Sequence, residues 1–115
     1  MYIKTNRSDF YTNHLFVASN GFSSKILTED VQPARAQVLI TSPIKNLKIK
    51  GTFHLEQGYY YFRNIDDRIL LGGGRNLDFK GEETAEFGLT DRIQQKLEDL
   101  LKNTILPNTD FEIAH

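Results

Sequence analysis

The stretch GYYYFRNIDDRILLGGG, residues 58–74, constrains the fold more than any other part of the chain. An aromatic run and an apolar run stand on either side of two aspartates at 66–67, a pattern typical of an antiparallel hairpin with a tight turn. A turn there pairs Tyr61 with Gly72, so that large rings lie opposite glycines across the two strands. Because side chains alternate along a strand, Tyr60 is expected on the other face.

The glycines at 72–74 match no phosphate-binding motif. A P-loop continues as Gly-Lys-Ser/Thr and opens a helix, but Gly74 is followed by Arg75 and Asn76. The dinucleotide fingerprint Gly-x-Gly-x-x-Gly fails at Leu77, which stands where the third glycine belongs. We therefore expect the glycines to permit close packing against another element. The alternative is that they let a cofactor or substrate approach the backbone.

The other segments predict an α+β fold, a mainly antiparallel sheet with one long C-terminal helix. Alternating or β-branched runs predict strands over residues 2–5, 9–19, 35–42, 51–57 and from 111 onward. Residues 88–106 predict the helix, because apolar residues recur there at the spacing of one stripe: Leu89, Ile93, Leu97, Leu100 and Leu101. Asp91, or alternatively Thr90, is expected to cap this helix, and Pro107 to end it.

Composition excludes several classes of function. The 115 residues suffice for one small domain, and a net charge of −1 argues against a nucleic-acid-binding face. The absence of cysteine excludes disulfides, zinc–thiolate sites and cysteine nucleophiles. No apolar run approaches the roughly 20 residues of a membrane span. We expect a cytoplasmic protein without nucleic-acid or membrane partners.

Few residues suggest chemistry directly. An arginine can clamp a carboxylate with two parallel hydrogen bonds, and a tyrosine hydroxyl can add a third. Arg63, close to a run of tyrosines, could act so, or the rings could be core and the arginine exposed. His54 and Glu56 share a predicted strand face without a third ligand, so we expect no metal site. A small hydrolase built on that pair would lack a visible nucleophile.

Four segments, taken in order, resemble one enzyme family. LFVASNGF (15–22), PARAQVLITSPI (33–44), the hairpin at 58–74 and LTDRIQQKLEDLLKNTILP (89–107) resemble the FAD-dependent amine and amino-acid oxidoreductases. This family includes D-amino-acid oxidase, glycine oxidase and sarcosine oxidase. The similarity covers residues 13–115, and the order and spacing of the segments carry it.

The resemblance implies a Rossmann-like FAD domain and a substrate domain that closes over an amine or amino acid, which is oxidised by hydride transfer to the flavin. Residues 1–22 would be a piece of the FAD domain, and residues 23–115 an incomplete substrate-binding α+β domain. Candidate FAD neighbours are Ala18, Asn20 and Gly21, and candidate substrate-binding residues are Tyr60, Tyr61 and Arg63. Tyr60 matches the substrate-side tyrosine of the family. The resemblance assigns no catalytic residue in this chain.

The departures from the family pattern define what this chain can do alone. The Gly-x-Gly-x-x-Gly fingerprint, the tryptophan–glycine segment and the C-terminal flavin loop of the family are absent, and the chain has no Trp. The chain is therefore interpreted as an interior fragment that does not bind FAD tightly, is inactive alone and dimerises through exposed edges. The alternative is a stand-alone α+β binding or assembly module without catalysis.

Overall fold

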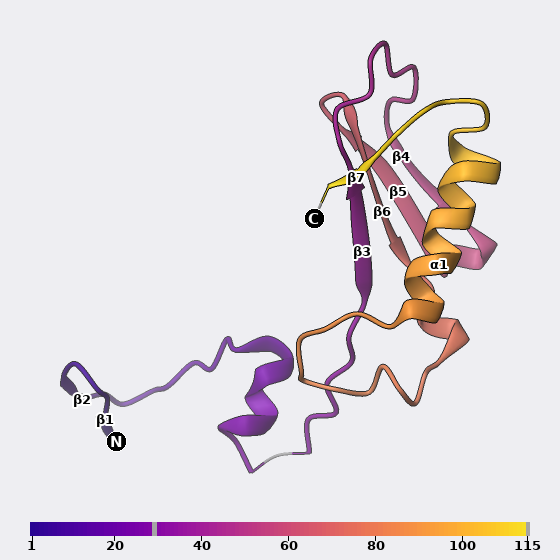
Figure 1. Cartoon of the computed structure of the whole chain (residues 1–115). Coiled ribbons are helices and arrows are strands. Elements are labelled where there is room, and N and C mark those ends of the chain that lie inside the picture. The colour runs from indigo at the N-terminus through magenta and orange to yellow at the C-terminus, as the bar shows by residue number, and fades with distance from the viewer. Residues whose placement is uncertain (29, 115) are drawn as a thin grey trace. The chain divides into compact units, whose positions relative to one another are not determined.

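The computed structural model describes residues 1–28 and 30–114 (Figure 1). Its contacts divide the chain into two compact units, Met1–Pro33 and Ala34–His115, which are described separately below. The resemblance placed a domain boundary after residue 22 instead. Since compact units need not coincide with the domains of a larger protein, the assignment of residues 1–22 to an FAD domain stays a prediction.

The first unit has little regular structure. Strands β1 (Tyr2–Lys4) and β2 (Asp9–Tyr11) pair antiparallel, and a 3₁₀ helix, η1 (Asn20–Lys25), follows later. The strand expected over residues 9–19 is thus wrong beyond Tyr11. Thr12 gives a physical reason why the strand ends there. Its hydroxyl donates a hydrogen bond of 2.8 Å to the carbonyl of His14, and this local turn replaces pairing with another strand.

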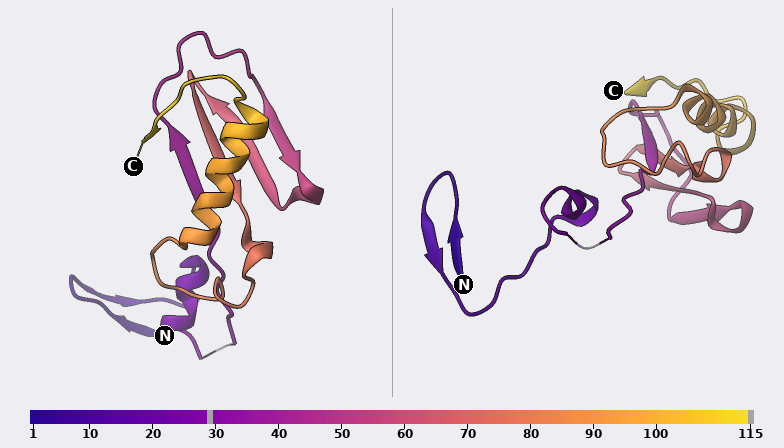
Figure 2. Two further views of the ribbon diagram at one scale, coloured as in Figure 1. Left: turned by 45° about the vertical axis from the view of Figure 1, so that its right-hand side comes forward. Right: turned by 90° about the horizontal axis from the view of Figure 1, so that it is seen from below.

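The second unit is built on a five-stranded sheet (Figure 2). Its strands are β3 (Gln37–Thr41), β4 (Thr52–Leu55), β5 (Tyr60–Ile65), β6 (Arg68–Gly73) and β7 (Ile113–Ala114). They lie in the order β4-β5-β6-β3-β7, and every neighbouring pair is antiparallel. The predicted α+β class with a mainly antiparallel sheet is therefore confirmed.

The C-terminal helix is shorter than expected. The α-helix α1 (Asp91–Leu100) continues only as a five-residue π-helical turn, η4 (Leu101–Ile105). Thr90, not Asp91, occupies the N-cap position, and its side chain makes no capping hydrogen bond. Leu89 precedes the helix and is 61% exposed, so it does not belong to the buried stripe. Within residues 1–28 and 30–114, no helix combines the length and apolar character that crossing a membrane requires.

Helix α1 covers one face of this sheet (Figures 1 and 2). The buried side chains between them form one hydrophobic core: Leu39, Ile44, Tyr60, Phe62, Ile69, Leu71, Ile93, Leu97, Leu100, Leu101, Ile105 and Leu106. The alternate strand positions point away from α1. We call this second side of the sheet the open face, and its central residues are Val38, Ile40, Tyr61, Arg63, Leu70 and Gly72.

Candidate functional site

The hairpin of β5 and β6 has the register expected from the sequence. Tyr61 lies opposite Gly72, and the ladder closes at the pair of Ile65 and Arg68. The turn between them is tight because Asp66 adopts a positive φ of 53°, a conformation that aspartate tolerates better than most residues. The pairing fixes which side chains reach the open face, so the candidate site can be read directly from the two strands.

The three glycines are required by packing. A β-carbon on Gly72 would lie 2.7 Å from both the ring and the hydroxyl of Tyr61, which crosses the bare backbone at this point. A β-carbon on Gly73 would collide with the carbonyl oxygen of Tyr59, and the φ of Gly73 is +122°. Gly74 is left-handed at φ +80° and abuts Ile93 of α1. The close-packing interpretation of the glycines is thus confirmed.

Tyr60 points into the core. Its side chain is fully buried toward α1, and its hydroxyl has no hydrogen-bond partner among the described residues. Burial raises the pKa of the Tyr60 hydroxyl, and the charge of Glu56 adds to this increase. The nearby Asn76 side chain lowers the pKa of the Tyr60 hydroxyl, but the two side chains are not hydrogen-bonded. The structure therefore separates Tyr60 from the other two substrate-side candidates.

Tyr61 and Arg63 lie together on the open face, two residues apart on β5. Tyr61 is half-buried over Gly72, whereas Arg63 is exposed beside Leu70. The strand residues on this face, all of which the structure describes, include no Asp or Glu. An aromatic ring and a guanidinium without a competing carboxylate can bind a planar or anionic group.

A buried carboxylate that we did not predict joins β3 to the start of α1. Glu82 is 1% exposed, and Arg35 donates two hydrogen bonds of 2.9 Å to it, from Nε to Oε2 and from Nη2 to Oε1. Gln37 Nε2 donates to the same Oε1 at 2.9 Å, and Thr90 Oγ1 at 2.6 Å. The Gln37 amide oxygen accepts from the Thr90 backbone N–H and from Nε2 of Gln94. We call these five side chains the Glu82 network.

The electrostatics of this network favour the ionised acid. The hydrogen bonds from Arg35 are the largest cause of the lowered pKa of Glu82, and the hydrogen bonds from Thr90 and Gln37 lower it further. Together they outweigh desolvation, which acts in the opposite sense, and lower the pKa of Glu82 from 4.5 to about 2. The Glu82 network therefore holds a permanent buried ion pair, which suits a structural role better than proton transfer near neutral pH.

The FAD-side candidates lie in the first unit. Ala18 and Asn20 are exposed, and Asn20 has a positive φ of 50° where η1 begins. A β-carbon on Gly21 would lie 3.0 Å from that of Pro33. These residues are close in sequence, whereas Tyr61 and Arg63 belong to the second unit. Their role as FAD neighbours stays a prediction.

The histidine–carboxylate pair considered from the sequence is not on one strand. β4 ends at Leu55, and Glu56 has a positive φ of 47° in a 3₁₀ turn, η2 (Glu56–Gly58). The shared strand face of His54 and Glu56 was therefore wrong, because the chain turns before Glu56. In the described part of the chain, no three His, Asp or Glu side chains gather as metal ligands.

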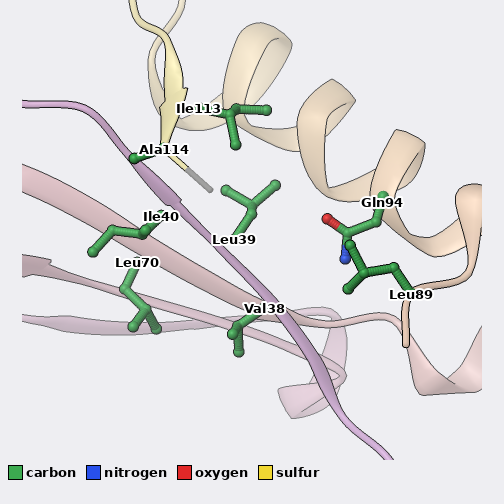
Figure 3. A pocket seen from close by; sticks show the side chains of 8 residues that line it. All are labelled: Val38, Leu39, Ile40, Leu70, Leu89, Gln94, Ile113 and Ala114. Carbon is green, nitrogen blue, oxygen red and sulfur yellow. The ribbon is translucent and has the colours of Figure 1, made fainter. Parts of the chain in front are cut away.

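An open depression of about 390 Å³ borders β3 (Figure 3). Seven of its eight lining residues are apolar: Val38, Leu39, Ile40, Leu70, Leu89, Ile113 and Ala114, with Gln94 as the polar member. Figure 3 shows Leu39 between Ile113 of β7 and Gln94 of α1. No local sequence pattern predicts this depression, because its lining residues come from β3, β6, β7 and α1 and from Leu89 before α1, which are far apart along the chain.

Comparison with known proteins adds no relative. No family model, no curated protein and no solved structure matches the chain. The functional argument therefore rests on the residues and their arrangement.

Proposed function

We propose that this chain is the substrate-side part of an FAD-dependent oxidoreductase that oxidises an amine or an amino acid. The flavin would accept the hydride, and this chain would supply a surface that binds and orients the substrate. The order of the four resembling segments supports the proposal, and so does the antiparallel pairing of β5 and β6, which the resemblance requires. The chain alone is expected to be inactive.

The observation that carries the proposal is the composition of the open face. The end of the Tyr61 ring lies against the backbone of Gly72, and Arg63 is two residues further along the same strand. A guanidinium binds a carboxylate through two parallel hydrogen bonds, and a ring can lie against a flat or apolar group. Since no strand residue on this face carries a negative charge, neither group has an internal competitor there.

The two segments that bracket the substrate domain in the resemblance are held by the Glu82 network. Arg35 and Gln37 belong to the segment at 33–44, and Thr90 and Gln94 belong to the segment at 89–107. These hydrogen bonds join residues more than 50 positions apart and tie the start of the helix to β3. This rigidity is what positioning of a substrate requires.

The described residues of the first unit do not by themselves form a site for FAD. Pyrophosphate groups bind where a helix N-terminus directs backbone N–H groups at them. The described residues of the first unit contain a short hairpin and a six-residue 3₁₀ helix, and no α-helix. Ala18, Asn20 and Gly21 could line one edge of a nucleotide site whose other walls must come from further polypeptide.

The coding sequence that surrounds this chain provides the decisive test. The proposal expects an upstream strand–helix unit with a Gly-x-Gly-x-x-Gly motif in the same reading frame. In the resulting full-length protein, Tyr61→Phe and Arg63→Met should lower kcat/KM for the substrate, whereas Lys45→Met, on an exposed loop, should not. Stop codons immediately on both sides would refute the proposal, as would stoichiometric flavin bound to the chain alone.

A stand-alone binding module is the second candidate, and one observation favours it. All twelve buried hydrophobic side chains among the described residues belong to the unit Ala34–His115. That unit thus has a hydrophobic core of its own. In this case the open face would bind a partner or ligand without catalysis, and the coding-sequence test separates the two candidates.

A further inference from the structure

The open face carries two arginines, of which the proposed function uses one. Arg63 on β5 lies opposite Leu70 on β6, and Arg68 is two residues before Leu70 on the same strand. Because alternate positions of a strand share a face, Arg68 lies on the open face together with Leu70 and Arg63. Arg68 is half-buried, whereas Arg63 is exposed. In the proposed function Arg63 binds a carboxylate, and Arg68 has no assigned partner.

The two guanidinium groups are held at separate places. Arg63 and Arg68 occupy diagonal positions on neighbouring strands, which are about 7–8 Å apart. Nη1 of Arg68 donates a hydrogen bond of 3.2 Å to the carbonyl of Thr41 on β3, and β3 and β5 lie on opposite sides of β6. This bond directs the Arg68 guanidinium away from Arg63. The face therefore suits two separate anionic groups better than a single phosphate.

An apolar floor lies beside these two arginines. Leu70 is opposite Arg63 on one side and opposite Ile40 on the other (Figure 3). Leu70 and Ile40 are half-buried and share the open face with the two arginines. Tyr61, two residues before Arg63, adds an aromatic ring at the border of this floor. Such a floor is suited to the methylene groups of a ligand whose charged ends reach the arginines.

The positive charges of this face have no internal counterion. The chain has 15 acidic residues, yet none of the strand residues on the open face, all of which the structure describes, is acidic. His54, opposite Tyr61, adds a basic side chain to this face. Asp66 and Asp67 at the hairpin turn precede Arg68, but within residues 1–28 and 30–114 neither forms an ion pair with it. The face is thus complementary to a ligand with more than one negative group.

We propose that the substrate of this surface is an amino acid whose side chain carries a second carboxylate. The inference rests on the proposed function and names its substrate class. Arg63, beside the Tyr61 ring, binds the carboxylate of the amino-acid backbone. Arg68, held at one end by Thr41, binds the side-chain carboxylate through its remaining N–H groups, and the methylene groups of the substrate lie over Leu70. A substrate with one carboxylate leaves Arg68 unpaired and therefore binds less tightly.

The test compares two achiral acids of equal chain length, glutarate with a carboxylate at each end and pentanoate with a carboxylate at one end. Each acid is titrated into the ¹⁵N-labelled chain at constant ionic strength, and the Nε–H signals of the arginines are followed by NMR. We expect glutarate to bind about tenfold more tightly than pentanoate, well beyond the statistical advantage of a second equivalent group. The signals of Arg63 and Arg68 should both move with glutarate, but only the Arg63 signal should move with pentanoate.

Three variants locate the preference for glutarate. Arg68→Met should remove the preference and leave the affinity for pentanoate unchanged, whereas Arg63→Met should weaken the binding of both acids. Arg92→Met removes the same charge from an exposed position of α1, the helix that covers the other face of the sheet, and should leave the preference intact. If Arg68→Met does not fold, the arginine signals of the wild-type chain still decide the question.

Equal affinities of the wild-type chain for the two acids would overturn the inference, and so would an Arg68 signal that glutarate does not move. A preference that Arg92→Met removes as fully as Arg68→Met would also overturn it, because the overall charge would then be the cause. Flavin takes part in none of these measurements. The proposed function can therefore fail at the coding sequence while the preference for glutarate holds. Equal affinities in a chain whose coding sequence contains the upstream fingerprint would refute the substrate class alone.

Discussion

Replacement of Glu82 by glutamine is the most informative perturbation of this protein. The change keeps the size of the side chain and one carbonyl oxygen, but removes the charge that Arg35 contacts with two hydrogen bonds of 2.9 Å. Gln37 and Thr90 can still donate to the remaining oxygen. The variant therefore removes the charge and the acceptor of Arg35 Nε, and keeps the acceptor for Gln37 and Thr90.

The size of the effect follows from the pKa of Glu82. A fall from 4.5 to about 2 corresponds to about 3 kcal/mol at 1.36 kcal/mol for each pKa unit. Breaking a buried ion pair costs about 3–5 kcal/mol when one charge stays buried. Arg35 keeps 20% exposure and can regain water, so we expect a loss of about 2–3 kcal/mol for Glu82→Gln at pH 7.

The same pKa predicts the pH dependence and its sign. The folded state lowers the pKa of Glu82, so its stabilisation is present above pH 4.5 and is lost as the pH falls toward about 2. Between pH 7 and pH 3 the wild-type protein should lose about 2 kcal/mol through this residue. Glu82→Gln has no proton to take up there, so this part of the pH dependence should vanish.

Urea unfolding at pH 7 and at pH 3 measures both quantities. At pH 7 the midpoint of Glu82→Gln should fall by about 2 M, given an m value of about 1–1.5 kcal/mol/M. Glu83→Gln removes the same charge from an exposed neighbour and should shift stability by less than about 0.5 kcal/mol. If wild type and Glu82→Gln lose stability in parallel between the two pH values, the assignment of the low pKa to Glu82 is refuted.

Three further predictions concern the hairpin and the association of the chain. Gly73→Ala should prevent folding of the second unit, because its β-carbon would collide with the Tyr59 carbonyl oxygen. Gly72→Ala should lower the free energy of unfolding by only about 1–3 kcal/mol, because the neighbouring side chain can move. Urea unfolding followed by circular dichroism ranks the two variants, and equal stability would contradict the packing described. Tyr60→Phe should leave the free energy of unfolding unchanged or raise it by up to about 1 kcal/mol, because the lost hydroxyl is buried without a partner. A clear loss of stability in urea would show instead that the Tyr60 hydroxyl makes a stabilising hydrogen bond. The chain alone should form dimers through its exposed edges and apolar side chains, and light scattering that gives a monomer of 13.2 kDa would contradict this expectation.

The hairpin could be predicted from the sequence because all its determinants are local. Two aspartates between an aromatic and an apolar run leave one natural place for the turn, and this fixes Tyr61 against Gly72. The same register places Tyr60 and Tyr61 on opposite faces. The helix covers the face of Tyr60 because Ile93 of α1 packs beside Gly74 and in the same core as Tyr60. These contacts join residues far apart in the sequence, so no local pattern predicts them.

The Glu82 network was missed because its members are far apart in sequence. Arg35 and Glu82 are separated by 47 residues, and the loop that contains Glu82 has no periodic pattern. One signal was available. Arg35, two residues before β3, and Gln37 in β3 lie at alternate positions with the buried Leu39, and buried polar residues require partners. Such a pair should prompt a search for an acid elsewhere in the chain.

The unequal distribution of the core has a calorimetric consequence. Every buried hydrophobic side chain that the structure describes lies in Ala34–His115, while Phe16 in the first unit is 90% exposed. Cooperative heat uptake follows the residues that pack, at about 0.7 kcal/mol per residue near 60 °C. The melting enthalpy of this chain should thus be about 57 kcal/mol, the value for the second unit. A chain that unfolds as one cooperative unit would instead absorb about 80 kcal/mol. Heat absorbed above the smaller value would report how far the first unit acquires order by association.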